Sequence, residues 1–232
     1  MSMIRNCGVI VMVIAGFFWL MSVLIDMSPT TKNTSVAVST EDWERAKQEN
    51  QEKKAKQEKA RQEKIDFLYN FIESANKNYD QAQQITWVDS VGRQPFGHKG
   101  IYTYMGIKGR VESGGSKFLR AIIHYSDRNW VFFNRVTFSN TEESWTYHLS
   151  SSDLYQNKKE TVVMGGIHET LDLPFNKIER GLRILASGEN PRIDFVGEYR
   201  ATKQLTAAEI ENIKTYIKLQ EAIDELGASR SY

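Results

Sequence analysis

Residues 117–139 read KFLRAIIHYSDRNWVFFNRVTFS, and this stretch decides the fold of the distal part of the chain. Residues 117–126 and 129–139 are rich in aromatic and β-branched side chains, which favour strands. Between them stand the turn-forming residues Asp127 and Asn129. We therefore predict two strands joined by a short turn.

The same alternation of strands and turns extends to both sides of this stretch. On the N-terminal side, Gly114 and Gly115 predict a two-residue hairpin loop, which would pair Glu112 with Lys117, Val111 with Phe118 and Ile107 with Ile122. On the C-terminal side, a turn at 140–144 leads into the strand SWTYHLS. Further strands are expected at 161–173 and 192–201.

Two helices complete this region, and both have the capping-box spacing at their start. The pair Asn176 and Glu179 opens the segment NKIERGLRILAS, and the pair Thr206 and Glu209 opens a C-terminal helix expected to end at Gly227. No strand-helix-strand unit repeats, so the sheet should be mostly antiparallel. The prediction is an α+β domain over residues 84–232, with the C-terminal helix packed on the sheet.

Before this domain, the chain is strongly helix-forming. Residues 41–64 read EDWERAKQENQEKKAKQEKARQEK, with Glu-to-Lys pairs four residues apart. A helical stalk over 41–82 is therefore predicted. Between Ala46 and Lys64 the only candidates for apolar heptad positions are Ala46, Ala55 and Ala60, which are too few for a regular heptad, although a coiled-coil dimer stays an alternative. After residue 64 an apolar stripe appears, which we expect to pack on the following domain, or else on another chain or a membrane surface: Ile65, Leu68, Phe71, Ile72, Ala75, Tyr79 and Ala82.

The N-terminal segment is apolar. Residues 8–25, GVIVMVIAGFFWLMSVLI, hold no charge, and as a helix they would span about 27 Å, close to the thickness of a bilayer core. We predict an uncleaved signal-anchor, preceded by a short cytoplasmic N-terminus over 1–7 and followed by a flexible linker over 26–40. Arg5 beside the segment favours a cytoplasmic N-terminus, which would place the distal domain in the periplasm or outside the cell.

An anchor, a charged helical stalk and a distal domain in this order resemble the layout of bacterial envelope-spanning proteins of the TolA type. The resemblance concerns architecture and composition alone and implies no shared activity. It favours a cell-envelope setting.

Composition excludes several classes of protein. There are 30 Lys and Arg against 29 Asp and Glu, a net charge of +1, and a single cysteine, Cys7. A disulfide-built scaffold is therefore excluded, and a nucleic-acid coat is disfavoured because no basic stripe exists. Neither a nucleophile elbow nor a Walker-type glycine loop is present in the sequence.

The residues that could carry chemistry are scattered. We predict no catalytic, cofactor-binding or metal-binding residues, and expect the four histidines to make ordinary hydrogen bonds. Residues 92–100, GRQPFGHKG, are the best loop for binding a ligand.

The tryptophans are expected in the core, with a binding groove as the alternative. Arg192, Asp194, Glu198 and Arg200 share one strand face and should form cross-strand ion pairs. The side chains considered for a site are His98, His124, His148, His168, Glu169, Asp172, Asp194, Glu198, Trp87, Trp130 and Trp145.

These features together predict a single-pass inner-membrane protein that presents a non-catalytic interaction domain in the cell envelope. Its partners would be the membrane, through residues 8–25, and another envelope protein or a second copy of the chain. Two alternatives stay open: an anchored polymer hydrolase that uses carboxylates as acid and base, and a structural oligomer assembled through the anchor and the stalk.

Overall fold

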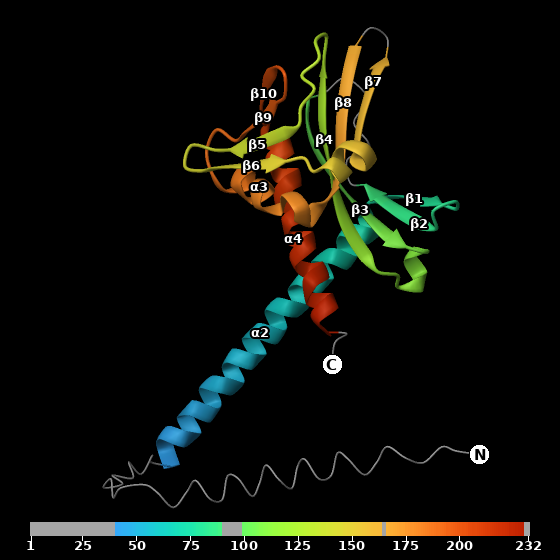
Figure 1. Ribbon diagram of the computed structural model, residues 1–232. Coiled ribbons are helices and arrows are strands. Elements are labelled where there is room, and N and C mark those ends of the chain that lie inside the picture. Colours follow the sequence, from blue (N-terminus) through green and yellow to red (C-terminus); the bar gives the residue numbers. More distant parts are fainter. Residues whose placement is uncertain (1–39, 90–98, 164–165, 230–232) are drawn as a thin grey trace, which may run out of the picture. The chain divides into compact units, whose positions relative to one another are not determined.

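The computed structural model describes residues 40–89, 99–163 and 166–229 (Figure 1). The predicted N-terminus, anchor and linker up to residue 39 lie outside these ranges. In the described ranges no helix has both the length and the apolar character needed to span a membrane. Contacts divide the chain into residues 1–52 and 53–232, and the sheets and their helices belong to the second unit.

The first helix, α2, runs from Thr40 to Ser74, with Glu41 and Asp42 in its first turn. Its C-terminal part carries the predicted apolar stripe. Leu68 and Ile72 are buried in the core, and the Phe71 ring contacts the Tyr216 ring edge-on at 5.7 Å. The expectation that the stripe packs on the following domain is confirmed for Leu68, Phe71, Ile72 and Ala75. Tyr79 and Ala82 lie beyond the helix and are exposed.

The helix predicted over 41–82 is wrong beyond Ser74, because residues 76–80 form a strand. This strand, β1 (Asn76–Asp80), pairs with β2 (Ile85–Asp89). Lys77 explains the break: its Nζ donates to the carbonyl oxygens of Ile72, Glu73 and Ala75, which lie at the end of the helix. Asp80 then closes the turn by accepting from the backbone N–H groups of residues 82 and 83.

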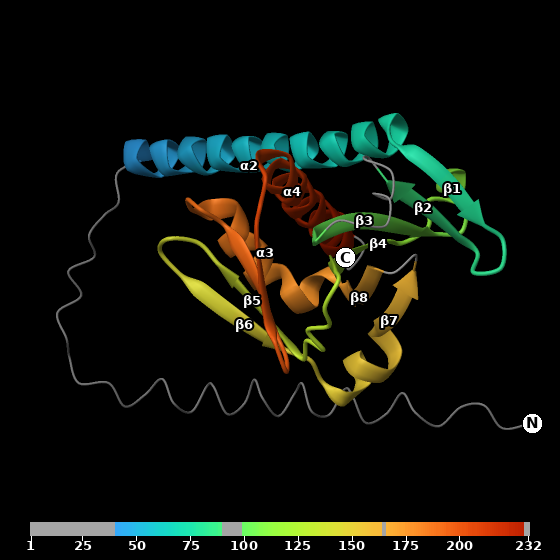
Figure 2. The same cartoon turned by 90° about the horizontal axis from the view of Figure 1, so that it is seen from above.

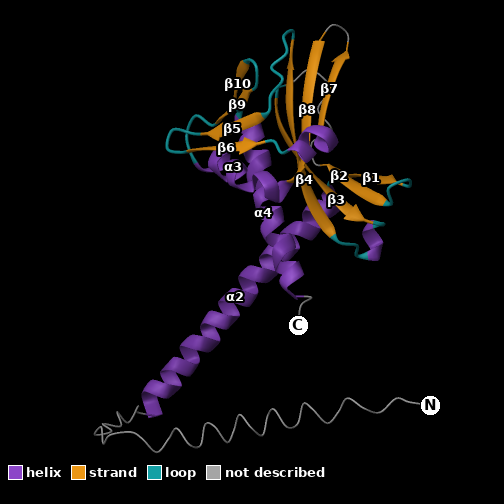
Figure 3. Ribbon diagram, in the orientation of Figure 1, coloured by secondary structure: helices purple, strands orange, loops and turns teal. Residues whose placement is uncertain are grey.

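A six-stranded antiparallel sheet has the order β1-β2-β3-β4-β8-β7 (Figure 3). Its other strands are β3 (Gly100–Lys108), β4 (Lys117–Asp127), β7 (Lys158–Val163) and β8 (Gly166–Pro174). Alternate residues of the central strands are buried, among them Met105, Ala121 and Leu171. We call the opposite side of this sheet its outer face.

The predicted Gly114-Gly115 hairpin has a different register. Ile107 pairs with Lys117, and residues Val111–Ser113 form a 3-10 turn inside a longer connection. Gly114 adopts φ 64°, and a Cβ on Gly115 would lie 1.7 Å from the carbonyl oxygen of Lys108. The two glycines therefore do shape the connection, but the strands separate earlier than a two-residue loop would require.

A second, four-stranded antiparallel sheet has the order β10-β9-β5-β6. It consists of β5 (Arg135–Ser139), β6 (Ser144–His148), β9 (Arg192–Val196) and β10 (Arg200–Gln204). The predicted turn between β5 and β6 is confirmed, and Asn140 Oδ1 accepts from the backbone N–H groups of Glu142 and Glu143.

Two strand predictions are wrong in the same way, because each expected strand is a hairpin of two. Residues 161–173 contain the end of β7 and most of β8, and residues 192–201 contain β9 and the start of β10. The strands on either side of Asp127 are not hairpin partners either, since β4 and β5 belong to different sheets. The segment between them is irregular and is described below.

Two helices complete the α+β fold. Helix α3 (Phe175–Ser187) contacts β5, β6 and the last helix, and α4 (Ala207–Ser229) contacts β3 and β4 (Figures 1 and 2). The predicted packing of the C-terminal helix on the sheet is confirmed. That helix continues to Ser229, past the end predicted at Gly227.

One of the two capping boxes forms. The Thr206 N–H donates to Glu209 Oε2 at 2.7 Å, and the Glu209 N–H donates to Thr206 Oγ1 at 3.3 Å. The box predicted at Asn176 is wrong, because the helix already begins at Phe175, directly after Pro174, and has no side-chain cap. Pro174 is the N-cap residue, with φ −54° and ψ 135°, and its side chain has no oxygen that could accept from the first N–H groups of the helix.

Candidate functional site

An irregular segment connects the two sheets, and a buried carboxylate holds it. The segment is residues 129–134, which we call the aromatic loop. Glu169 on β8 is fully buried, and its Oε1 accepts from the backbone N–H groups of Val131 and Phe132 at 2.7 and 2.8 Å. Its Oε2 accepts from the N–H of Phe133 at 2.9 Å. Three consecutive backbone N–H groups therefore donate to one carboxylate. Because Glu169 satisfies these donors, residues 131–133 do not need the carbonyl groups of a neighbouring strand.

Lys158 supplies the countercharge for Glu169. Its Nζ lies 3.0 Å from Glu169 Oε2 and its side chain is 6% exposed. The same ammonium lies 4.6 Å from the centre of the Phe133 ring and also reaches Glu160. A buried carboxylate is costly unless it is paired and hydrogen-bonded, and Glu169 has both kinds of partner.

Both ends of the aromatic loop are also fixed. The Tyr125 hydroxyl donates to the carbonyl oxygen of Asn129 at 2.8 Å. Burial raises the pKa of Tyr125 to about 12, and the carboxylates of Asp127 and Glu169 add to the effect. The hydroxyl therefore keeps its proton and stays a donor. At the other end, the Asn134 N–H donates to the carbonyl oxygen of Val196 at 3.1 Å.

The loop presents aromatic rings to solvent. Phe132 has φ 52°, a conformation that costs a bulky residue energy, and the residue is 39% exposed. Trp130 is half-buried and stacks on Phe132, with ring centroids 5.0 Å apart and an angle of 9° between the planes. Trp130 is therefore not the buried core residue that was expected.

The turn between β9 and β10 lies against the same loop. The Tyr199 N–H donates to the carbonyl oxygen of Val131 at 3.3 Å, and the Tyr199 side chain is 62% exposed. Gly197 permits this approach, because a Cβ there would lie 2.2 Å from the carbonyl oxygen of Phe132. We call Trp130, Phe132 and Tyr199 together the aromatic surface.

The other two candidate tryptophans lie elsewhere. Trp145 on β6 stacks against the core residue Phe138 at 5.7 Å, as expected of a core residue. Trp87 on β2 is on the outer face, where its ring contacts Tyr104 and Phe118. The three tryptophans therefore do not line one common groove.

Beside Trp87, the outer face holds an ionic cluster. Arg120 Nε donates to Asp172 Oδ1 at 2.9 Å, and the Tyr104 hydroxyl donates to Asp172 Oδ2 at 2.7 Å. Burial and the hydrogen bond to Asp172 raise the pKa of Tyr104. Arg120 on β4 and Asp172 on β8 neutralise each other, and the uncharged Tyr104 hydroxyl adds a hydrogen bond from β3.

The remaining carboxylate candidates are not brought together. Asp194 accepts from the Thr202 hydroxyl at 2.6 Å and lies 3.6 Å from Arg192 on its own strand. Glu198 lies exposed in the turn between β9 and β10. The expected cross-strand ion pairs between them are therefore wrong, because Thr202 and not an arginine stands opposite Asp194.

The structure brings two of the predicted histidines together. His124 Nε2 and His168 Nδ1 are 3.3 Å apart on β4 and β8. His148 is exposed on β6, in the other sheet, and His98 lies outside the described residues. Most of the candidate loop at 92–100 also lies outside them. Of its last residues, Lys99 pairs with Asp127 and Gly100 begins β3.

A second buried carboxylate, Asp153, was not predicted. It begins a π-helical turn, η2 (Asp153–Asn157), and accepts from the side chains of Tyr147, Ser150, Asn157 and Lys177 at 2.7 to 3.0 Å. Burial alone would raise the pKa of Asp153, but the donors, led by Lys177, outweigh it and hold the pKa well below its usual range.

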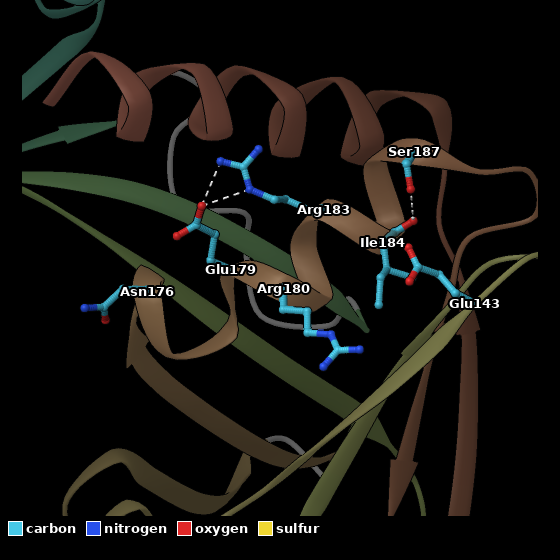
Figure 4. A pocket seen from close by; sticks show the side chains of 7 residues that line it. All are labelled: Glu143, Asn176, Glu179, Arg180, Arg183, Ile184 and Ser187. Carbon is cyan, nitrogen blue, oxygen red and sulfur yellow. Dashed lines mark hydrogen bonds and ion pairs between the residues drawn. The ribbon is translucent and has the colours of Figure 1, made fainter. Parts of the chain in front are cut away.

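An open hollow of about 550 Å³ lies along α3, lined by Glu143, Asn176, Glu179, Arg180, Arg183, Ile184 and Ser187 (Figure 4). Its charges are mixed. Arg183 pairs with Glu179 at 2.7 Å and with Glu221 at 3.3 Å. The hollow therefore has no dominant charge that would select a ligand.

No known protein family, curated protein or solved structure matches this chain. The fold and the site define its class directly. It is an α+β domain of two antiparallel sheets, with an aromatic surface that a buried ion pair and backbone hydrogen bonds hold in place.

Sequence reasoning missed the role of Glu169, although a signal for it exists. Ile167, Leu171 and Leu173 are buried and share a strand face with Glu169. A carboxylate in the middle of an apolar strand face must be buried and must have partners. The identity of those partners, three backbone amides, has no sequence signature.

Proposed function

We propose that this chain is a single-pass membrane protein that presents a non-catalytic binding domain in the cell envelope. In this proposal the aromatic surface is the contact site for another envelope protein. The observation that carries it is the Phe132 ring, which is exposed although its backbone occupies the left-handed region.

The conformation of Phe132 supports a role in binding. Left-handed backbone costs a residue other than glycine about 1–2 kcal/mol. Phe132 is 39% exposed, so burial of its ring offsets this cost only in part. Strained residues that persist on a surface cluster at binding and active sites, and aromatic side chains dominate the energetics of protein interfaces.

The rigidity of the loop adds to this support. Glu169 fixes residues 131–133 through their backbone, and Tyr125 fixes Asn129. The rings on the loop are therefore held in one arrangement before any partner binds, which lowers the entropy lost on association.

The carboxylates favour binding over hydrolysis. A glycosidase needs one carboxyl group to give up a proton and a second to act as base or nucleophile. In the described residues, Glu169 is paired with Lys158, Asp172 with Arg120, and Asp194 with the Thr202 hydroxyl. Glu169 does stand opposite a second carboxylate, Glu160 on β7, but the Lys158 ammonium pairs with both. Neither is therefore arranged as a proton donor beside a free base.

The membrane part of the proposal rests on the sequence of residues 8–25, which is uncharged and long enough for a bilayer core. The charged helix α2 follows, as a spacer would. A periplasm-active reporter fused after Tyr232 tests the orientation. Activity of the reporter is expected, and its silence would place the domain in the cytosol.

Site-specific photo-crosslinking tests the contact site. A photoreactive residue in place of Tyr199, in the full chain expressed in its own cells, should give a discrete protein adduct. The matched control is Tyr155, which is 89% exposed and lies in η2, where no adduct of that size is expected. Adding Phe132→Gly, which removes the ring at a backbone angle that glycine favours, should abolish the adduct.

Three results would overturn the assignment of the contact site. One is the absence of an adduct at Tyr199, a second is the same adduct at Tyr155, and a third is an adduct that persists in Phe132→Gly. An adduct with the mass of two chains would favour the structural oligomer instead.

A further inference from the structure

Two buried histidines face each other on the outer face of the six-stranded sheet. His124 on β4 and His168 on β8 are 9% and 5% exposed. They are diagonal neighbours, since His124 is opposite Thr170 and His168 is opposite Ser126. His168 directly precedes Glu169, and successive strand residues point to opposite faces, so the pair is separate from the site that holds the aromatic loop.

We propose that His124 and His168 form a binding site for a divalent transition-metal ion of the zinc class. Imidazole nitrogen is a preferred ligand of Zn²⁺, Co²⁺, Ni²⁺ and Cu²⁺, whereas Mg²⁺ and Ca²⁺ prefer oxygen. The ligand atoms are His124 Nε2 and His168 Nδ1.

The distance between these nitrogens fits a shared ion. They are 3.3 Å apart. With metal–nitrogen bonds of about 2.1 Å, this separation corresponds to an angle of about 104° at the metal, close to the tetrahedral value that zinc adopts. The separation of the two nitrogens therefore suits one shared ion.

The strands hold the pair in this geometry. β4 and β8 are adjacent and hydrogen-bonded over eight residue pairs from Arg120–Pro174 to Asp127–Ile167. The two rings belong to residues within this ladder and not to a loop, and sites on strands are more precise than sites on loops. The ligands are therefore placed before the ion arrives.

Ion binding requires a defined proton position on each ring. A hydrogen bond between the two nitrogens needs one of them to carry a proton, but a metal needs the lone pair of both. In the metal-bound form, His124 therefore carries its proton on Nδ1 and His168 on Nε2. Between two neutral rings this is a change of tautomer, in which one proton changes its place on a ring and none is released from the pair.

The described residues supply only part of a coordination sphere. They contain no group of three or more His, Cys, Asp or Glu side chains that could hold a metal. The residues opposite the pair on the neighbouring strands, Ser126, Thr161 and Thr170, offer only hydroxyl groups, and Gly100 offers no side chain. Water would therefore complete the coordination in this proposal, and the affinity should be lower than that of a structural zinc site with four protein ligands.

Calorimetric titration of the full chain in detergent with Zn²⁺ tests the proposal. Cys7→Ser is used as the background so that the single thiol does not compete. One ion per chain is expected, with affinity lowered about tenfold or more in His124→Gln and in His168→Asn. The matched control is His148→Ala, because His148 is exposed on β6 in the other sheet and should leave the affinity unchanged.

Two further measurements exclude misleading results. Circular dichroism of each variant in EDTA establishes that it is folded, and a variant that fails is replaced by the other histidine's variant. Co²⁺ should give visible absorption bands typical of nitrogen ligands, and Mg²⁺ should give no heat. The proposal would be overturned if folded wild-type chain bound no Zn²⁺, or if His148→Ala weakened binding as much as the paired variants do.

Discussion

The two buried carboxylates of the domain each hold an irregular segment, but they do so through different groups. Glu169 accepts from the backbone amides of residues 131–133, and only its countercharge, Lys158, is a side chain. Asp153 accepts mainly from side chains, those of Tyr147, Ser150, Asn157 and Lys177, with one backbone amide, that of Ser150.

This difference decides which side chains are free for function. A segment held through its amides keeps its shape whatever side chains it carries, so Trp130 and Phe132 can be used for contact. In a segment held through side chains, those side chains are already bound and are not available to contact a partner. The aromatic loop is therefore the better place for a binding surface, and residues 150–157 serve to join β6 and β7 to α3.

The largest expected effect is that of Glu169→Gln. The substitution removes the charge that pairs with the Lys158 ammonium, which then has Glu160 as its remaining carboxylate partner. It also replaces one acceptor oxygen by an NH₂ group, which cannot accept from a backbone N–H such as that of Phe133. The free energy of unfolding should fall by about 3 kcal/mol, at the lower end of the range for a broken buried ion pair. Urea denaturation followed by tryptophan fluorescence measures it.

The control for that variant is Glu160→Gln, whose side chain is 39% exposed. It should cost less than about 1 kcal/mol, because a pair that is partly exposed is screened by solvent. Equal losses in the two variants would mean that Glu169 is no more important to the loop than a surface carboxylate.

Asp153→Asn should have the next largest effect, about 1–3 kcal/mol at neutral pH, because a buried acceptor of several hydrogen bonds is weakened. The pKa of Asp153 is lowered by folding, so its contribution is complete above the unfolded value of about 3.9 and is lost as the pH falls through the folded value. The stability difference between wild type and variant should therefore shrink below about pH 4. A difference that stays constant down to pH 2 would contradict the ionic role of Asp153.

A pair of milder variants compares the two segments directly. Ser150→Ala removes a hydroxyl that donates to Asp153 at 2.7 Å and should cost about 1 kcal/mol. Asn134 is bound through its backbone N–H and carbonyl groups, and its side chain is exposed. The free energy of unfolding of Asn134→Ala should therefore stay within about 0.5 kcal/mol of wild type. Thermal unfolding of the two variants measures this difference. A larger loss of stability in Asn134→Ala than in Ser150→Ala would contradict the distinction between the two segments.

The smallest effect distinguishes two substitutions at one site. Phe132→Gly should be more stable than Phe132→Ala by about 1 kcal/mol, because alanine must still occupy φ 52° while glycine does so at little cost. Both lose the same ring, so packing cancels in the comparison. If the alanine variant were the more stable, the left-handed conformation of residue 132 would be in doubt.

Local signals in the sequence predicted much of the fold. The Thr206 and Glu209 box, the β5–β6 turn at Asn140 and the apolar stripe at Leu68 all depend on residues close together in the chain, and all three are confirmed. Errors arose where a side chain outside a predicted element binds the backbone of that element, as at the end of the helix predicted over 41–82. Lys77 ends α2 by binding its carbonyl oxygens, which helix periodicity does not reveal.

The site was less predictable than the fold. Trp130 was singled out, but its partner Phe132 lies in a stretch that looks like a continuous strand. The strand fails there because Glu169, 37 residues away in the sequence from Phe132, takes the amides that a ladder would use. A backbone-to-carboxylate contact of this kind leaves no periodicity, so only the structure reveals it.

Hydrogen exchange of individual amides tests the central claim, that Glu169 holds the aromatic loop rigid. The account predicts that the amides of Val131, Phe132 and Phe133 exchange as slowly as those of neighbouring strands, although they lie outside any strand, and that Glu169→Gln accelerates all three while β3 stays protected. Fast exchange of these amides in the wild-type protein, at the rate of an open loop, would contradict it.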